Sequence, residues 1–221
     1  MPELYIVSTP IGNLEDITLR AIRTLKEVDF IICEDTRYTG KLLKHLNIQK
    51  PLISFHGYSG KDKAVKLLER IVNGEKAALV TDSGTPGISD PGYLITSGAA
   101  ELGIKLIPIP GPSAFLTALQ GSGAPINQFT YIGFLPVKKG RQTLLKKLKE
   151  EEDKTIVLYE SVHRIQKTLS ELAEHLGKDR KIIVARELTK MFEEFFRGTI
   201  GEAIKHFNKP KGEFVVIIPA E

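Results

Sequence analysis

The sequence has one cysteine, Cys33, and no tryptophan among its 221 residues. A single cysteine excludes an internal disulfide and any metal cluster held by cysteines alone. Its neighbours Phe30, Ile31 and Ile32 are apolar, which favours a buried, unreactive thiol over a catalytic one. No stretch approaches the roughly 18 apolar residues of a membrane span, and no basic segment with an apolar core opens the chain. We therefore expect a cytoplasmic protein with no membrane partner.

Positive charge is in small excess and is unevenly distributed. The formal net charge is +4, and the excess lies entirely in residues 111–221. The densest basic run, at residues 138–149, consists of Lys138, Lys139, Arg141, Lys146, Lys147 and Lys149, and acidic residues follow at 150–153. Neutralising phosphates dominates affinity for nucleic acid, so this run could contact RNA. The alternative is a solvated surface helix without a partner.

Short apolar runs alternate with segments of helical periodicity, which indicates successive βα units on a mainly parallel sheet. In the first half we predict strands at residues 4–9, 29–34, 51–55, 77–82 and 105–109. Asp16 is the expected N-cap of the first helix, and Gly74 the expected stop of a later one. In the second half we predict strands in FTYIGFLP, TIVLYE, KIIVARE and EFVVIIP, with a strand–turn–strand ending.

A glycine-rich break, GSGAP, lies near the middle of the chain. We assign residues 1–118 to an N-terminal domain with a mainly parallel sheet, and residues 119–221 to a C-terminal domain with a mixed sheet. The predicted fold class is thus α/β with two domains. A ligand is expected in a crevice between them, since domain interfaces commonly hold ligands.

Three loops rich in glycine or proline follow predicted strands: TPIGN at 9–13, SGTPGISDPG at 83–92 and PGPSA at 110–114. The carboxyl ends of parallel strands share one edge of a sheet, so the loops could converge on one site, although a turn explains each alone. In PGPSA, Pro112 suits the first helical position, and Ser113 could face a ligand there.

The stretch from 81 to 92 contains no lysine or arginine, and neither a Walker nor a dinucleotide-binding fingerprint occurs. It offers Asp82 and Asp90, hydroxyl groups and glycine backbone instead. Buried charge requires a partner, so this surface suits a cationic ligand such as S-adenosylmethionine better than ATP or NAD. An alternative role for the two aspartates is to hold the loop in shape.

Two polar segments end predicted strands. In CEDTR, Glu34 and Asp35 could supply a general base and Arg37 a phosphate contact, while the alternative is a helix cap with a surface ion pair. In YESVHR, polar residues from Tyr159 to Arg164 suggest a site, and a helix start capped by Ser161 explains part of the pattern. The histidines show no metal-ligand spacing, so no metal is expected.

Read together, LYIVSTPIGNLEDITLRA, CEDTR, VTDSGTPGISDPG, PIPGPSA and YESVHR resemble the tetrapyrrole methylase superfamily, in its branch of ribosomal RNA small subunit methyltransferases. The resemblance covers nearly the whole chain. It implies a homodimer that binds S-adenosylmethionine and methylates the ribose 2′-hydroxyl of a cytidine in the decoding region of 16S rRNA, as free rRNA or small ribosomal subunit. The cofactor-lining residues that it implies are Pro10, Ile11, Gly84, Thr85, Pro86, Ile88, Ser89, Ser113, Ala114, Tyr159 and Ser161.

Methyl transfer to a ribose hydroxyl needs alignment and benefits from a base. The candidates for a base are Glu34, Asp35 and His163, and those for positioning phosphate are Arg37 and Arg164. Two other functions stay open. One is methylation of a tetrapyrrole or another small molecule with the same cofactor, and the other is RNA binding without catalysis.

Overall fold

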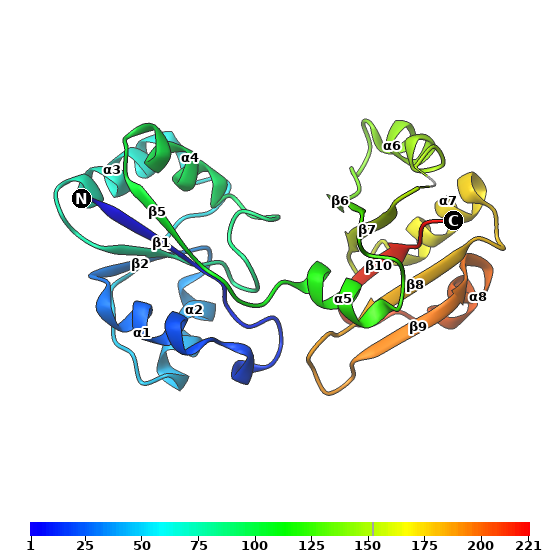
Figure 1. Ribbon diagram of the computed structural model, residues 1–221, viewed down its shortest axis with the longest axis horizontal. Helices are drawn as coiled ribbons and strands as arrows, with labels where there is room; N and C mark the ends of the chain where they lie inside the picture. The colour runs from blue at the N-terminus through cyan, green and yellow to red at the C-terminus, as the bar shows by residue number, and fades with distance from the viewer. Residues whose placement is uncertain (152) are drawn as a thin grey trace. The chain divides into compact units, whose positions relative to one another are not determined.

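The computed structural model describes residues 1–151 and 153–221, which form two compact units, Met1–Ser113 and Ala114–Glu221 (Figure 1). We expected the boundary after residue 118. It falls earlier because helix α5 (Ala114–Ser122) contacts strands of the second sheet and belongs to that unit. Glu152, part of the acidic run at 150–153, lies outside the described residues. None of the helices in the described ranges is long and apolar enough to span a bilayer.

The first unit is built on a five-stranded sheet in which all neighbouring strands are parallel, in the order β3-β2-β4-β1-β5. The strands are β1 (Glu3–Val7), β2 (Phe30–Cys33), β3 (Leu52–Ser54), β4 (Ala77–Leu79) and β5 (Lys105–Ile109). All five were predicted from the sequence: the bounds of β5 are as predicted, and those of the other four differ by one to three residues at an end.

Helices cover both faces of this sheet, as Figure 1 shows. Along β2, Phe30 and Ile32 pack with α3 (Gly60–Val72) and α4 (Tyr93–Glu101), whereas Ile31 and Cys33 pack with α1 (Leu19–Glu27) and α2 (Thr36–His45). The neighbouring strands β1 and β4 therefore lead to helices on opposite faces. Their loops diverge at the carboxyl edge, which is where open α/β sheets bind ligands.

Of the two helix ends predicted from the sequence, one is wrong and one is confirmed. Thr18 caps α1, because its side chain accepts from the Ala21 N–H, so the prediction of Asp16 as this cap is wrong. Asp16 lies instead in a short 3₁₀ turn, Leu14–Asp16, capped by Asn13. Gly74 follows α3 with a φ of +105°, which confirms it as the helix stop.

The second unit holds a mixed sheet in the order β6-β7-β10-β8-β9. Its strands are β6 (Phe129–Phe134), β7 (Thr155–Glu160), β8 (Lys181–Arg186), β9 (Glu194–Thr199) and β10 (Phe214–Ile218). Only β6 and β7 pair in parallel. The core on one face is shared with α6 (Arg141–Leu148), α7 (Ile165–Leu176) and α8 (Ile200–His206), while α5 contacts β7, β8 and β10.

The predicted strand–turn–strand ending is wrong, because β9 and α8 lie between β8 and β10. Strand β9 is an edge strand that pairs with β8 alone among the described strands, and none of its residues is fully buried. Its sequence, EFFRGT, therefore lacks the apolar run that marks a central strand.

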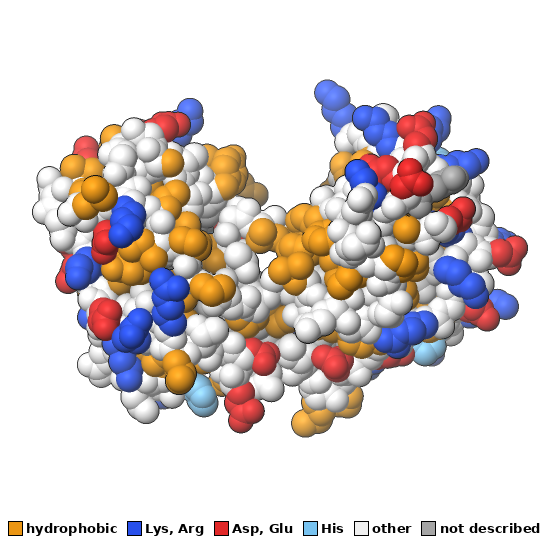
Figure 2. All heavy atoms as spheres, in the orientation of Figure 1, with side chains coloured by type: hydrophobic (Ala, Val, Ile, Leu, Met, Phe, Trp, Pro, Cys, Tyr) orange, Lys and Arg blue, Asp and Glu red, His pale blue; other side chains and the backbone are white. Residues whose placement is uncertain are grey.

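Not all basic side chains of the run at residues 138–149 are exposed to solvent. Five of its six members are exposed, but the side chain of Arg141 is only 4% exposed. On the face seen in Figure 2, basic and acidic side chains are mixed on both units.

Close packing of α3 against α4 generates a stability prediction. A Cβ added at Gly98 on α4 would lie 2.7 Å from Cδ1 of the buried Leu68 on α3. We expect Gly98→Ala to lower the free energy of unfolding by about 1–2 kcal/mol, because overpacking outweighs the gain in helix propensity. Gly201→Ala on α8 is the matched control, since its nearest contact would be 3.4 Å. Chemical denaturation measures both, and equal effects would contradict the packing argument.

Candidate functional site

The loops that follow β1 and β4 are joined by a pair of backbone hydrogen bonds. The Thr9 N–H donates to the Gly84 carbonyl at 2.9 Å, and the Gly84 N–H donates back to the Thr9 carbonyl at 3.1 Å. Gly84 has a φ of +85°, and a Cβ there would lie 3.4 Å from Cγ2 of Ile11. This position therefore requires glycine for its backbone conformation, while a Cβ would meet Ile11 at an ordinary contact distance.

Side-chain hydroxyls extend the connection to the third loop. The hydroxyls of Ser8 and Thr85 lie 3.1 Å apart, and Thr85 donates to the Pro112 carbonyl at 3.0 Å. Gly111 completes the close approach, because a Cβ there would lie 3.0 Å from that of Ser8. The three loops expected to converge do meet at one edge of the first sheet. Sequence reasoning did not single out Ser8 or Thr9, although hydroxyl residues that end a buried strand were the available signal.

The two aspartates of the β4 loop hold backbone groups. Asp90 accepts from the N–H groups of Gly87 at 2.8 Å and Gly92 at 2.7 Å. Asp82 accepts from the Asp35 N–H at 3.0 Å, so it ties this loop to the end of β2. Burial raises the pKa of both carboxyls. The interpretation that these residues shape the loop is confirmed.

Glu34 lies at the end of β2, beside β4. Its Oε2 accepts from the hydroxyl of the buried Thr81 at 3.2 Å, and Thr81 in turn accepts through its carbonyl from Thr9 at 3.1 Å. Burial, and then the negative charge of Asp82, raise the pKa of Glu34 above its ordinary value. Of the acidic groups that follow β2, it is the one whose pKa is shifted toward that of a useful base. Thr81, its hydroxyl partner, was not anticipated as a site residue.

Asp35 has a different environment. Its carboxylate caps α2 by accepting from the Arg37 N–H at 2.8 Å, and it pairs with the Arg37 guanidinium at 2.5 Å. These bonds lower the pKa of Asp35 to about 2. Helix cap and ion pair together match the alternative interpretation of CEDTR. Arg37 itself is largely exposed, with 84% of its side chain accessible.

The remaining cofactor candidates of the first unit lie in the same loops. Pro10 and Ile11 follow the Thr9–Gly84 bridge directly, and Pro86, Ile88 and Ser89 lie on the β4 loop, with Ile88 38% exposed. Ser113 is the last residue of this unit, and α5 starts at Ala114, so Pro112 does not occupy the first helical position.

In the second unit, Tyr159 is the penultimate residue of β7 and lies within an aromatic cluster. Its hydroxyl accepts from the Phe115 N–H at 3.1 Å, and its ring lies 5.4 Å from Tyr131 and 5.5 Å from Phe134. Ser161 does not cap α7, whose N-cap is Arg164, although its carbonyl accepts from the Arg164 N–H at 3.0 Å.

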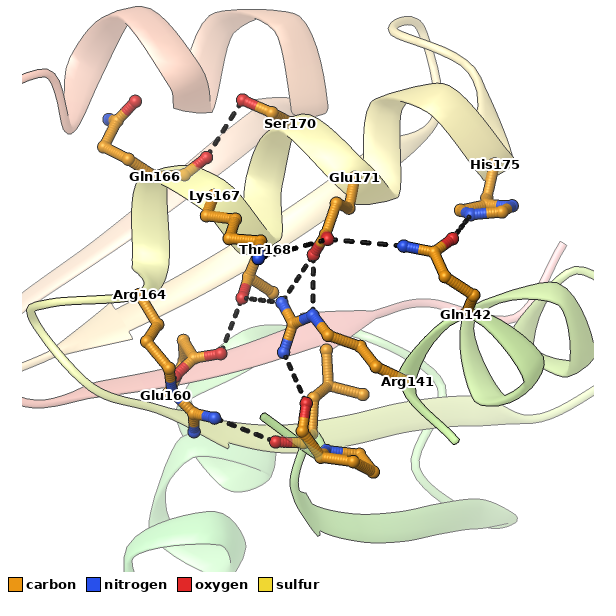
Figure 3. A network of polar contacts seen from close by, with 12 residues as sticks. Arg141, Gln142, Glu160, Arg164, Gln166, Lys167, Thr168, Ser170, Glu171 and His175 are labelled. Atoms are coloured by element: carbon orange, nitrogen blue, oxygen red, sulfur yellow. Dashed lines mark hydrogen bonds and ion pairs between the residues drawn. The ribbon is translucent and has the colours of Figure 1, made fainter. Parts of the chain in front are cut away.

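The Arg164 side chain is held by protein groups (Figure 3). It pairs with the buried Glu160 at 2.9 Å and donates to the Leu135 carbonyl at 2.9 Å. A phosphate would have to compete with both partners. His163, one position earlier, is exposed.

Cys33 is buried and free, and burial raises the pKa of its thiol, which agrees with an unreactive side chain. Within residues 1–151 and 153–221, no group of three or more histidine, cysteine or acidic side chains is placed to hold a metal ion.

The family Tetrapyrrole (Corrin/Porphyrin) Methylases matches residues 3–204, which is most of the chain. The chain belongs to this family. Curated relatives named "Ribosomal RNA small subunit methyltransferase I" are similar over nearly its full length. That of Synechocystis sp. is 50% identical over 97% of this chain and 78% of its own length. Those of Thermotoga maritima and Escherichia coli O157:H7 are 48% and 45% identical, over 99% and 98% of this chain and 98% and 77% of their own lengths.

Solved structures share the fold at low sequence identity. The methyltransferase CobJ superposes with a TM-score of 0.75 at 20% identity, covering 100% of this chain and 95% of its own. A diphthine synthase gives a TM-score of 0.76 at 15% identity, covering 98% and 89%. These likenesses confirm the two α/β sheets, one parallel and one mixed, as the tetrapyrrole methylase fold.

The Thr9–Gly84 bridge generates a prediction. We expect Gly84→Ala to lower the free energy of unfolding by about 1–2 kcal/mol, because an L-residue is strained at a φ of +85°. Gly57→Ala is the control, since its Cβ would meet nothing within 4 Å and its φ is not positive. Thermal and urea unfolding measure the difference. Unchanged stability in Gly84→Ala would show that the bridge does not constrain these loops.

Proposed function

We propose that the protein is an S-adenosylmethionine-dependent methyltransferase of small-subunit ribosomal RNA, and that its acceptor is the ribose 2′-hydroxyl of a cytidine in the decoding region of 16S rRNA. The observation that carries this proposal is a sequence identity of 45–50%, over nearly the whole chain, to relatives named "Ribosomal RNA small subunit methyltransferase I". A ribosomal substrate also implies a cytoplasmic enzyme. Assembly as a homodimer stays a prediction.

The donor set at the carboxyl edge of the first sheet fits S-adenosylmethionine. The joined loops present hydroxyls and backbone groups, Asp82 and Asp90 give the β4 loop negative charge while they hold its backbone, and residues 81–92 hold no lysine or arginine for a polyphosphate. A cationic cofactor is matched by such a surface. The residues proposed to hold it are Pro10, Ile11, Gly84, Thr85, Pro86, Ile88, Ser89 and Ser113, with Ala114, Tyr159 and Ser161 from the second unit.

When bound, S-adenosylmethionine supplies an electrophilic methyl group, so the chain's own task is to orient the acceptor and to receive its proton. Glu34 is the favoured base. Its Oε2 is engaged by Thr81, which leaves Oε1 to take the proton of the ribose hydroxyl. The raised pKa makes this carboxylate a stronger base than an ordinary glutamate.

The other catalytic candidates take supporting roles in this proposal. Asp35 keeps Arg37 in place at the start of α2, and the exposed Arg37 guanidinium can reach a phosphate of the substrate. His163 is exposed and is the second choice as base, while Arg164 is committed to Glu160 and Leu135. Methylation of a tetrapyrrole or another small molecule has only the shared fold in its favour, and RNA binding without catalysis has no observation of its own.

The first functional prediction concerns ligand and substrate. We expect the protein to bind S-adenosylmethionine with a dissociation constant in the micromolar range, as measured by calorimetry, and to transfer a tritiated methyl group to undermethylated small ribosomal subunits. Nuclease mapping should find the label on one cytidine ribose. If the protein does not bind S-adenosylmethionine, the proposal of a methyltransferase is wrong. Label found only in a tetrapyrrole acceptor supports the alternative methyltransferase, and cofactor-free RNA binding supports the non-catalytic one.

The second functional prediction separates the two carboxylates. Glu34→Gln should lower kcat about 10²- to 10⁴-fold, because proton transfer is lost, with little change in cofactor affinity. Asp35→Asn is the matched isosteric control: asparagine still caps a helix, so the loss in kcat should be much smaller. In the wild type, kcat should fall as pH decreases through the raised pKa of Glu34, since only the ionised form accepts a proton. If Glu34→Gln keeps both the rate and this pH dependence, Glu34 is not the base.

A further inference from the structure

The segment that joins β6 to α6 is mostly exposed and has one buried residue. We call residues 134–140 the β6–α6 loop. Leu135 is buried in the core of the second unit, at 1% exposure, whereas the flanking Phe134 is 49% and Val137 68% exposed. Lys138 and Lys139 follow and are also exposed. A large apolar ring and two cations are thus presented to solvent next to an internal anchor.

Two arginine side chains donate hydrogen bonds to backbone carbonyls of this loop, as Figure 3 shows. Arg141 donates to the Pro136 carbonyl at 3.2 Å, and Arg164 donates to the Leu135 carbonyl at 2.9 Å. The two carbonyls that accept these bonds belong to consecutive residues. The start of the loop is therefore held by charge-assisted hydrogen bonds, which are stronger than neutral ones.

The two arginines are themselves held by acidic groups, of which Glu160 is buried and Glu171 is partly exposed. Arg141 pairs with Glu171 at 2.6 Å and donates to the Thr168 hydroxyl at 2.7 Å. Thr168 donates to Glu160 at 2.6 Å, and Glu160 pairs with Arg164. Lys167 also pairs with Glu171, at 3.9 Å. Because the Arg141 side chain is paired and only 4% exposed, it adds little to the surface charge, although it belongs to the basic run of the sequence.

The lysines have no such partners. Lys138 and Lys139 form no ion pair with any described residue, and the same holds for Lys146 and Lys147 on α6. Figure 2 shows basic side chains projecting over this helix. Phe134 belongs to the same loop as Lys138 and Lys139, and its ring centroid lies 5.8 Å from the Arg164 guanidinium and 5.5 Å from the Tyr159 ring.

We propose that the β6–α6 loop binds a single-stranded segment of the RNA substrate, with Phe134 stacking on an unpaired base and Lys138 and Lys139 contacting the flanking phosphates. An exposed aromatic ring and cations without an ion-pair partner among the described residues, carried on one short loop, are the combination that recognises single-stranded RNA. Free lysines gain by releasing counterions from phosphates, whereas paired ones do not. The proposal rests on the proposed function and specifies which surface of the second unit meets the RNA.

Two pairs of variants test the surface. Phe134→Leu removes the aromatic face and Phe134→Tyr keeps it. The double variant Lys138→Gln/Lys139→Gln removes two loop charges, and Lys146→Gln/Lys147→Gln removes the same charge from α6. The measurements are the KM for undermethylated small subunits and the affinity for a short fluorescent single-stranded RNA over a range of salt concentrations.

We expect Phe134→Leu to weaken RNA binding about tenfold and Phe134→Tyr to bind nearly as the wild type, because stacking persists in the latter. The loop double variant should reduce the slope of log affinity against log salt by about 1.4, as expected for two lost phosphate contacts on a single strand. The α6 variant should change this slope less. Calorimetric affinity for S-adenosylmethionine should stay the same in both lysine variants.

Three outcomes overturn the surface proposal. One is equal weakening by the two lysine double variants, which would mean that only net charge matters. Another is an unchanged KM and RNA affinity in Phe134→Leu and the loop variant while the wild type methylates subunits; the proposed function would then stand. The third is an absence of RNA binding by the wild type. If the wild type binds RNA through this loop but transfers no methyl group, the proposed function fails and the surface remains.

Discussion

The two hydrogen bonds between Thr9 and Gly84 join loops that would otherwise diverge, since β1 and β4 lead to helices on opposite faces of the sheet. This bridge depends on the positive φ of Gly84, and it brings Ser8 to Thr85 and Thr85 to Pro112. The glycines that interrupt the β4 loop therefore allow backbone to approach backbone. A residue with a Cβ would strain the backbone at Gly84, and it would crowd Ser8 at Gly111, where the Cβ atoms would lie 3.0 Å apart.

Four carboxylates lie near this edge, and their surroundings give them different uses. Asp90 and Asp82 accept from backbone N–H groups and set the shape of the β4 loop. Asp35 is neutralised by Arg37 at the start of α2. Burial raises the pKa of Glu34, as it does those of Asp82 and Asp90, but among these four Glu34 alone is bonded to a side-chain hydroxyl and holds no backbone N–H group of the β4 loop. The difference arises from neighbours, because the four side chains have the same chemistry.

In the second unit, some of the basic side chains counted in the sequence contribute little to the surface charge. Arg141 and Arg164 look like phosphate ligands in a basic half, yet both are turned inward to Glu171 and Glu160 and hold backbone carbonyls. Burying such ions is costly unless each is paired and hydrogen-bonded, and the network satisfies this condition through Thr168. The lysines around α6 keep their charge exposed.

The sequence by itself determined the α/β alternation, the five strands of the first sheet, the three glycine-rich loops and the exclusion of a polyphosphate cradle. These properties follow from periodicity and residue type, which are local. It did not reveal β9, whose half-exposed residues lack an apolar run, nor the cap of α1 at Thr18. Only the tertiary structure decided which carboxylate is free, which arginines are internal and that Thr81 supports Glu34. The physical reason is that burial and hydrogen-bond partners come from residues distant in the chain: Glu34 and Thr81 are 47 positions apart, and Ser8 and Thr85 are 77.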